Sequence, residues 1–278
     1  MKRPDGIEAL RLVEWEGGVS GAYPSLGFKA VADAELGNGD AYGLYWPYGR
    51  EDADPVVCDL LHDEWRLELA FSSVSVFRRY LDRNGGERGD LEVEDRALAS
   101  ARFLAVKRLL RDQPLEAAAQ LAALCDHFPE AAAYWYALAG QRRRLGDAEG
   151  CTRAAIRAFA SNWAFGMPRQ GTLRLLRNAA QRGLSPEDPL VRYSAELALD
   201  FGGRKRNDVY DVLQTCIEGY LDTDDVLLGL LLNQNYGYRM AMETRSFQER
   251  YGFERVRWLE QHSKRCSIHL GDTRRTIA

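Results

Sequence analysis

Four acids and three aromatic residues lie close together in the first quarter of the chain, and their types are those of a carbohydrate-active site. Paired carboxylates carry out the acid and base steps of glycoside hydrolysis, and exposed rings can stack on sugars. The residues are Tyr45, Trp46, Tyr48, Asp52, Asp54, Asp63 and Glu64. Aromatic residues in an alternating strand more often pack against a neighbouring strand, however, and acids in turns are usually solvated. We therefore do not expect a glycosidase.

The other arrangements that could support catalysis or cofactor binding are incomplete. The glycines of GNGDAYGLYWPYG at 37–49 connect two strands, whereas a phosphate-binding loop leads from a strand into a helix N-terminus. His62, Asp63 and Glu64 are adjacent and so lack the i, i+4 spacing of a helical zinc site. The GxSxG nucleophile motif is absent. We expect no catalytic residues, no cofactor and no metal, and hence a protein that is not an enzyme.

Cysteine spacing and the apolar segments indicate the compartment. The five cysteines are widely separated and form no CxxC pair, which predicts buried free thiols. The N-terminal MKRPDGIEALRL has no apolar signal-peptide segment. The longest apolar run, VLLGLLL at 226–232, is too short to span a bilayer. These features predict a cytoplasmic protein without a membrane partner.

Charge is distributed unevenly around the net value of −4. Between Asp33 and Glu68 there are ten acids and two bases, whereas the segment from Arg102 to Arg182 contains thirteen bases and six acids. An acidic segment repels nucleic acid and attracts a basic protein surface. We therefore expect a protein partner and no nucleic acid.

The acids and rings must be positioned by an antiparallel sheet, because apolar residues alternate in four short segments. The strands are expected at 28–36, 42–46, 55–61 and 65–69, with turn residues between them. Ser72 or Ser73 can cap a helix that runs to Leu81 and ends at the Asn-Gly-Gly of 84–86. The polar, glycine-bearing GGERGDLEVED at 85–95 then separates this part from the rest.

From Leu98 onward the pattern is helical, so the fold class is α+β: a small antiparallel-sheet domain at 1–86 followed by an all-α domain at 96–265. Large and small residues recur after 34 positions, a spacing that resembles tetratricopeptide repeats and predicts helical hairpins at 98–131 and 132–165. The corresponding pairs are Leu104 and Leu138, Ala105 and Ala139, Ala117 and Cys151, and Leu124 and Ala158. Beyond them we expect a degenerate third pair at 168–201, three or four helices in 206–262 and a polar tail from about 264.

The N-terminal motifs resemble the SUKH superfamily in their order and spacing. They are DAELGNGD at 33–40, YGL at 42–44, DPVV at 54–57, HD at 62–63, and FSS at 71–73 before Phe77. The resemblance covers roughly residues 28–84, and the helices that usually open that family are shortened or diverged here. Many bacterial SUKH proteins are immunity proteins that bind and neutralise a cognate toxin. The resemblance therefore implies a binding role that needs no catalytic site.

Our first hypothesis is that the chain is an immunity protein. It would occlude the active or binding surface of a cognate toxin, and that toxin would carry a basic surface. Acids would speed association and select the partner, while Trp and Tyr would supply most of the buried contact. The expected partner-binding residues are Asp40, Tyr45, Trp46, Tyr48, Glu51, Asp52, Asp54, His62, Asp63 and Glu64. Tyr42, Leu44 and Trp46 share a strand face that the core can cover, which favours Tyr45, Tyr48 and the loop acids as contacts.

The alternative is a scaffold or adaptor that binds a partner peptide through the groove of the helical repeats. Concave faces of such solenoids commonly bind peptides. Arg142, Arg143, Arg144 and Arg153 would then line the groove and bind acidic peptide ends. The same arginines are also compatible with a solvated helix face.

Overall fold

The structure is a computed structural model of the chain, and it describes residues 7, 10–13, 22–35, 39–85 and 95–271. Gly37, Asn38 and most of the expected separator at 85–95 lie outside these residues. The strands are β1 (Leu12–Val13), β2 (Phe28–Glu35), β3 (Ala41–Tyr45), β4 (Val56–Leu61) and β5 (Arg66–Phe71). The helices are α1 (Val74–Arg83), α2 (Ala99–Leu109), α3 (Pro114–His127), α4 (Ala132–Arg144), α5 (Ala148–Ala160), η2 (Trp163–Phe165), α6 (Gln170–Gln181), α7 (Pro189–Arg192), α8 (Asp208–Leu221), α9 (Val226–Ala241), α10 (Arg245–Arg250) and α11 (Arg255–Leu270).

The N-terminal part is an antiparallel meander in which each strand pairs with the next, in the order β1-β2-β3-β4-β5. The four strands predicted from alternation are present, and β1 is an additional strand too short to show a period. Helix α1 begins where the sequence places it, because the side chain of Ser73 accepts a hydrogen bond from the backbone N–H of Val76 (3.3 Å). An antiparallel sheet followed by helices makes the fold class α+β, as predicted.

Helix α1 covers one face of the sheet. Leu44 and Trp46 of the β3 segment are buried there against Phe77 and neighbouring residues of α1. The ring of Tyr42 lies between Phe77 and Tyr80, with centroid distances of 5.4 and 5.9 Å. Tyr42, Leu44 and Trp46 therefore do form a core face, as the period of two predicts.

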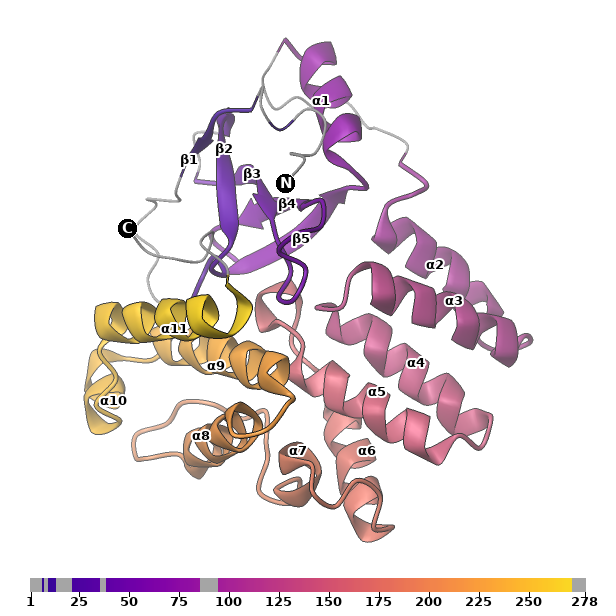
Figure 1. Ribbon diagram of the computed structural model, residues 1–278, viewed down its shortest axis with the longest axis vertical. Coiled ribbons are helices and arrows are strands. Elements are labelled where there is room, and N and C mark those ends of the chain that lie inside the picture. The colour runs from indigo at the N-terminus through magenta and orange to yellow at the C-terminus, as the bar shows by residue number, and fades with distance from the viewer. Residues whose placement is uncertain (1–6, 8–9, 14–21, 36–38, 86–94, 272–278) are drawn as a thin grey trace.

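The helical part covers the opposite face of the sheet. Phe28 and Tyr45, together with Cys58 and Leu60 of β4, belong to the same buried cluster as residues of α3 to α9. A Cβ atom added to Gly43 would lie 2.3 Å from Phe28 Cζ, so only glycine lets that ring cross β3. The hydrophobic core is thus continuous between the sheet and the helices. Figure 1 shows the sheet above the helical part, with α2–α6 along one side and α8–α11 along the other.

Helices α2 to α6 pack consecutively, as the repeat spacing predicts. Helices α3 and α5 begin at Pro114 and Ala148, 34 positions apart. Of the paired positions, those in α3, α4 and α5 are buried, but Leu104 is 60% exposed and Ala105 is also exposed. Helix α2 is the first of the stack, and among the described residues no earlier helix covers its outer face.

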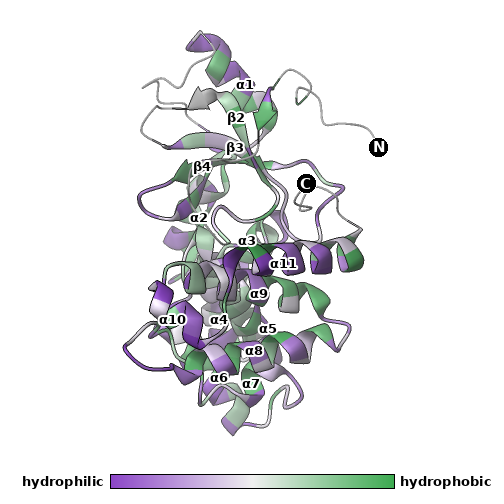
Figure 2. Cartoon of the chain, turned by 90° about the vertical axis from the view of Figure 1, so that its left-hand side faces the viewer, coloured by the Kyte–Doolittle hydropathy of each residue, from purple (hydrophilic) through white to green (hydrophobic). Residues whose placement is uncertain are grey.

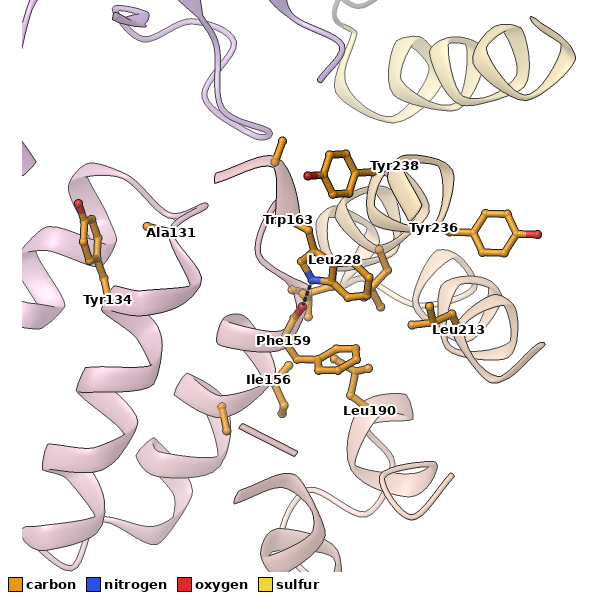
Figure 3. Close-up of a cluster of buried hydrophobic side chains, with 14 of the residues drawn as sticks. Ala131, Tyr134, Ile156, Phe159, Trp163, Leu190, Leu213, Leu228, Tyr236 and Tyr238 are labelled. Carbon is orange, nitrogen blue, oxygen red and sulfur yellow. Dashed lines mark hydrogen bonds between the residues drawn. The ribbon is translucent and has the colours of Figure 1, made fainter. Parts of the chain in front are cut away.

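The C-terminal helices complete the body around a dense aromatic and aliphatic core. Figure 3 shows Phe159 and Trp163 among side chains from neighbouring helices, with Trp163 Nε1 donating a hydrogen bond to the carbonyl of Phe159 (2.9 Å). The expected third helical pair is present only in part, because α7 has four residues. Four helices follow, as expected, but α11 continues to Leu270, so the prediction of a polar tail from about 264 is wrong for the described residues. In Figure 2, α10 and much of α11 have the colour of hydrophilic residues, whereas hydrophobic colour is seen around α5, α8 and α9.

Candidate partner-binding surfaces

Tyr45, one of the expected partner contacts, is fully buried in a polar cluster between the sheet and the helices. Its hydroxyl donates to Glu130 Oε2 (2.6 Å), and the backbone N–H of Tyr48 donates to Glu130 Oε1 (2.5 Å). The side-chain amide of Asn162 also donates to Oε2 (2.9 Å). These three donors stabilise a carboxylate that is itself fully buried at the start of the α4 segment. Glu130 thereby ties β3 to the helical part.

The side chain of Tyr48 is buried in a second polar chain, between α9 and α11. Asn233 Nδ2 can only donate, so His262 Nδ1 accepts (2.8 Å) and the ring hydrogen lies on Nε2. Nε2 then donates to the Tyr48 hydroxyl (2.9 Å), and that hydroxyl donates to Gln234 Oε1 (3.1 Å). The imidazole of His262 is fully buried and stacks on Trp258. These hydrogen bonds hold the loop after β3 against α9 and α11.

The expectation that Tyr45, Trp46 and Tyr48 bind a partner is therefore wrong for this structure, since each is less than 7% exposed. The reason is that β3 is covered on both faces, by α1 on one and by the helical body on the other. The AYGLYW segment at 41–46 carries apolar residues at both odd and even positions, which is typical of a strand buried on both sides. That signal was present in the sequence.

Four of the expected acids are exposed, but they lie at opposite ends of β4. Asp52 and Asp54 are exposed in the loop before β4, beside the partly exposed Glu51. Asp63 and Glu64 are exposed in the turn after it. A strand of this length separates its ends by about 17 Å. The structure therefore does not unite the predicted acids into one surface.

Asp40 and His62 do come together, at the second of these ends. Asp40 Oδ1 accepts a hydrogen bond from the backbone N–H of His62 (3.0 Å) and lies 2.9 Å from its Nδ1. His62 Nε2 lies 2.9 Å from Asp63 Oδ1. These contacts hold the turn between β4 and β5 against the turn before β3, so His62 has a structural partner on each side.

A cavity of about 570 Å³ adjoins the first acidic loop. Asp54 lies on one side of it and the serines at the start of α1, including Ser75, lie on the other. Arg50 crosses to the helical part, where its Nη2 donates to the carbonyl of Asp126 (2.5 Å). This first acidic loop, Glu51 to Asp54, therefore lies beside a hollow and is joined to the helical part through the neighbouring Arg50.

A groove that sequence analysis identified only in part runs over α4 and α6. It consists of two adjoining cavities of about 520 and 150 Å³, which share Arg143, Leu175 and Asn178. Its cations are Arg143, Arg174 and Arg182, all exposed, and none forms a hydrogen bond or ion pair with a described residue. Among the described residues, its lining contains no aspartate or glutamate. We call this surface the basic groove.

Small residues keep the basic groove open. A Cβ atom added to Gly140 of α4 would meet no atom within 4 Å, so this glycine faces open space. A Cβ at Gly171 would lie 2.1 Å from the Tyr136 hydroxyl, so glycine there lets the tyrosine ring lie across α6. The guanidinium of Arg169 sits over that ring at 5.7 Å. The groove thus combines cations, an aromatic wall and an exposed backbone.

Only one of the four arginines expected in the groove lines it. Arg142 Nη1 pairs with Asp147 Oδ2 (2.7 Å), and Arg144 donates to the carbonyls of Leu110 and Arg111, which joins α4 to the end of α2. Arg153 lines a different cavity. The expectation is therefore wrong for Arg142, Arg144 and Arg153 and holds for Arg143.

The described residues offer little other chemistry. They contain no group of three or more His, Cys, Asp or Glu side chains placed to hold a metal ion. All five cysteines are free and buried, as predicted. Burial raises the pKa of each thiol for which a shift is seen, and brings that of Cys216 to about 12. No helix in the described part of the chain is both long and apolar enough to cross a bilayer.

Comparison with known proteins places this architecture in a family. The YfbP N-terminal domain matches residues 14–90, and the YfbP C-terminal domain matches residues 200–278. A relative from Escherichia coli (strain K12), Uncharacterized protein YfbP, is 38% identical over 259 residues, which cover 91% of this chain and 92% of the relative. The chain belongs to the YfbP family. No solved structure matches it significantly.

The two YfbP matches bracket the basic groove. The N-terminal match contains most of the sheet and α1, and the C-terminal match contains α8 to α11. The groove lies on helices between them. Neither match is to the SUKH superfamily or to tetratricopeptide repeats, so those two resemblances stay predictions.

Proposed function

We propose that this YfbP-family protein is a non-catalytic cytoplasmic adaptor that binds an acidic peptide segment of a partner protein in the basic groove. The observation that carries the proposal is the lining of that groove: three exposed arginines, a tyrosine and small residues, with no carboxylate among them. Tyr45, Trp46 and Tyr48 are buried within the molecule and are not available to a partner.

The arginines suit carboxylates because each guanidinium offers several donors in a planar array. Arg174, Asn178 and Arg182 recur every four residues, so they form one stripe along α6. Arg143 faces the same groove from α4. Asn178 supplies an amide that can bond to a peptide backbone. An extended peptide with acids at alternating positions would match this stripe.

A display selection with random nine-residue peptides tests the proposal. Wild-type protein should enrich peptides rich in Asp and Glu, and Arg174→Glu should abolish that enrichment. Arg79→Glu, an exposed position on α1 away from the groove, provides the same charge reversal as a control and should enrich the same peptides. Enrichment of apolar or basic peptides, or equal loss in both variants, would contradict the proposed site.

A second candidate function, toxin neutralisation, is supported by the exposed acids at the two ends of β4. Asp52 and Asp54 project beside a hollow, as a loop that inserts into a basic surface would. In this reading the protein is an immunity protein that occludes a cognate toxin without catalysis. The buried rings leave the acids as the principal contacts.

Co-expression with the large secreted or contact-delivered protein encoded beside the gene tests this second candidate. Wild type should rescue growth and copurify with the toxin. Because the two acidic ends are about 17 Å apart, Asp52→Lys/Asp54→Lys and Asp63→Lys/Glu64→Lys serve as matched variants. Loss of rescue in only one pair locates the interface. Absence of a complex with the neighbouring product removes the immunity function for that pair.

A further inference from the structure

A cavity of about 570 Å³ lies on the other side of the helical body from the sheet, where α5, the α6–α7 loop and the α8–α9 loop meet. Its inner wall is apolar and includes Ile156 and Leu228, both buried in the core shown in Figure 3. Such a cavity has the size of a small-molecule site. It is separate from the basic groove and is not used by either proposed function.

Two cations lie on one wall of this cavity. Arg153 and Arg157 are one turn apart on α5, so their side chains leave the same face of the helix. Neither guanidinium has a hydrogen bond or ion pair with a described residue. Two guanidiniums side by side form a good site for one carboxylate or phosphate.

Two acids line the same cavity from other elements, Asp188 at the start of α7 and Asp225 at the start of α9. Asp188 caps α7 by accepting from the backbone N–H of Val191 (3.1 Å), and its Oδ2 accepts from the hydroxyl of Tyr220 (2.8 Å). Asp225 lies at the start of α9 and has no side-chain hydrogen bond there. The pKa of Asp188 is raised, mainly by burial of the carboxyl group and to a smaller extent by the nearby charge of Asp225. A cationic group between the two carboxylates would relieve this repulsion.

The opposite charges share one cavity but do not reach each other. No ion pair joins Arg153 or Arg157 to Asp188 or Asp225. The guanidinium nitrogens are therefore farther from these carboxylate oxygens than in an ion pair. Glu187, the third acid of the lining, is already paired with Arg192 (2.5 Å). A ligand that carries an anion at one end and a cation at the other would satisfy both pairs of charges at once.

We infer that this cavity binds a zwitterionic ligand of the short-peptide class, with its carboxylate at Arg153 and Arg157 and its ammonium group at Asp188 and Asp225. Ile156, Leu228 and the ring of Tyr220 would contact aliphatic side chains. A volume of about 570 Å³ exceeds that of a single amino acid and suits two or three residues. A phosphate ester would use the arginines but would leave the acids without a partner.

Calorimetric titration with four probes tests the inference: the dipeptide Leu-Leu, its N-acetyl form, its C-terminal amide, and inorganic phosphate. Leu-Leu should bind, and blocking either end should weaken binding at least tenfold. Arg157→Gln should bind Leu-Leu and its C-terminal amide with equal affinity. Asp225→Asn should bind Leu-Leu and N-acetyl-Leu-Leu with equal affinity. Testing each variant with each end-blocked dipeptide distinguishes recognition of the two ends of the dipeptide from a general loss of structure.

Without ligand, Arg157→Gln should keep the wild-type melting temperature, because its side chain is not hydrogen-bonded within the described residues. Asp225→Asn should melt at the wild-type temperature or slightly above it, because it removes the repulsion of Asp188. Arg153→Gln removes the other arginine of the pair and should have the same effect as Arg157→Gln. Binding of phosphate but not Leu-Leu, equal binding of the blocked dipeptides by wild type, or no binding of any probe would overturn the inference. The peptide selection on the basic groove is unaffected by any of these results, so the two proposals fail separately.

Discussion

Substitutions at Gly140 offer a direct test that the basic groove is open and that it binds acids. Gly140 lies in the interior of α4, and a Cβ there would meet nothing within 4 Å. Gly140→Ala should therefore gain the helix propensity of alanine without a clash, which is worth about 0.5–1 kcal/mol. For a chain of this size the melting temperature should rise by about 1–4 °C.

Gly140→Glu uses the same open space to place a carboxylate in the groove. Arg143 lies three positions further along α4, on the same side of the helix. Two unit charges 6 Å apart in water attract by about 0.7 kcal/mol. The introduced carboxylate should repel two peptide carboxylates at a similar distance by about 1.4 kcal/mol in total, which is a tenfold loss of affinity. Gly140→Gln has the same shape without the charge and should weaken binding less.

Fluorescence anisotropy with a labelled acidic peptide from the display selection measures these affinities, and thermal unfolding measures stability. If Gly140→Ala lowers the melting temperature, the position is not open. If Gly140→Glu and Gly140→Gln weaken binding equally, the groove excludes ligands by size and its charge is not used. Either result would refute the reasoning.

Three further predictions concern stability. Glu130→Ala removes the acceptor of three buried hydrogen bonds and should cost about 3–5 kcal/mol in urea unfolding, whereas Glu116→Ala, on the exposed side of α3, should change stability by less than about 0.5 kcal/mol. Gly43→Ala forces Phe28 to move and should destabilise by about 1–3 kcal/mol; an unchanged urea midpoint would show that the ring can shift freely. Because the folded-state pKa of Asp188 is raised, its ionisation lowers stability as the pH rises above 4. The stability of Asp188→Asn relative to wild type should therefore increase as the pH rises from 4 to 7, and a pH-independent difference in melting temperature would contradict this.

Local sequence patterns predicted the elements of the fold but not how the sheet and helices meet. The strands and α1 were readable because alternation and the Ser73 cap act within a few residues. The contacts of Tyr48 with Gln234 and His262 join positions 186 and 214 residues apart. Nothing local to the loop after β3 identifies those partners, so Tyr48 reads as an exposed ring in sequence and is buried in the structure.

The arginines show which part of the candidate site could have been predicted. Successive helical residues point about 100° apart, so three consecutive arginines cannot all line one groove. Arg142 and Arg144 accordingly bind within the molecule, and Arg143 faces the groove. The stripe of Arg174, Asn178 and Arg182 was visible as a spacing of four. Its role depends on the adjacent open face of α4, which only the packing reveals.

The affinity of the most enriched acidic peptide for wild type, Arg174→Glu and Arg79→Glu tests the central claim most directly. The account predicts a loss of at least tenfold for Arg174→Glu, no change for Arg79→Glu, and wild-type binding that weakens between 50 and 200 mM salt, because exposed charges are screened. Failure to enrich any acidic peptide, or an affinity that is the same in all three proteins, would contradict the assignment of the basic groove as the partner-binding site.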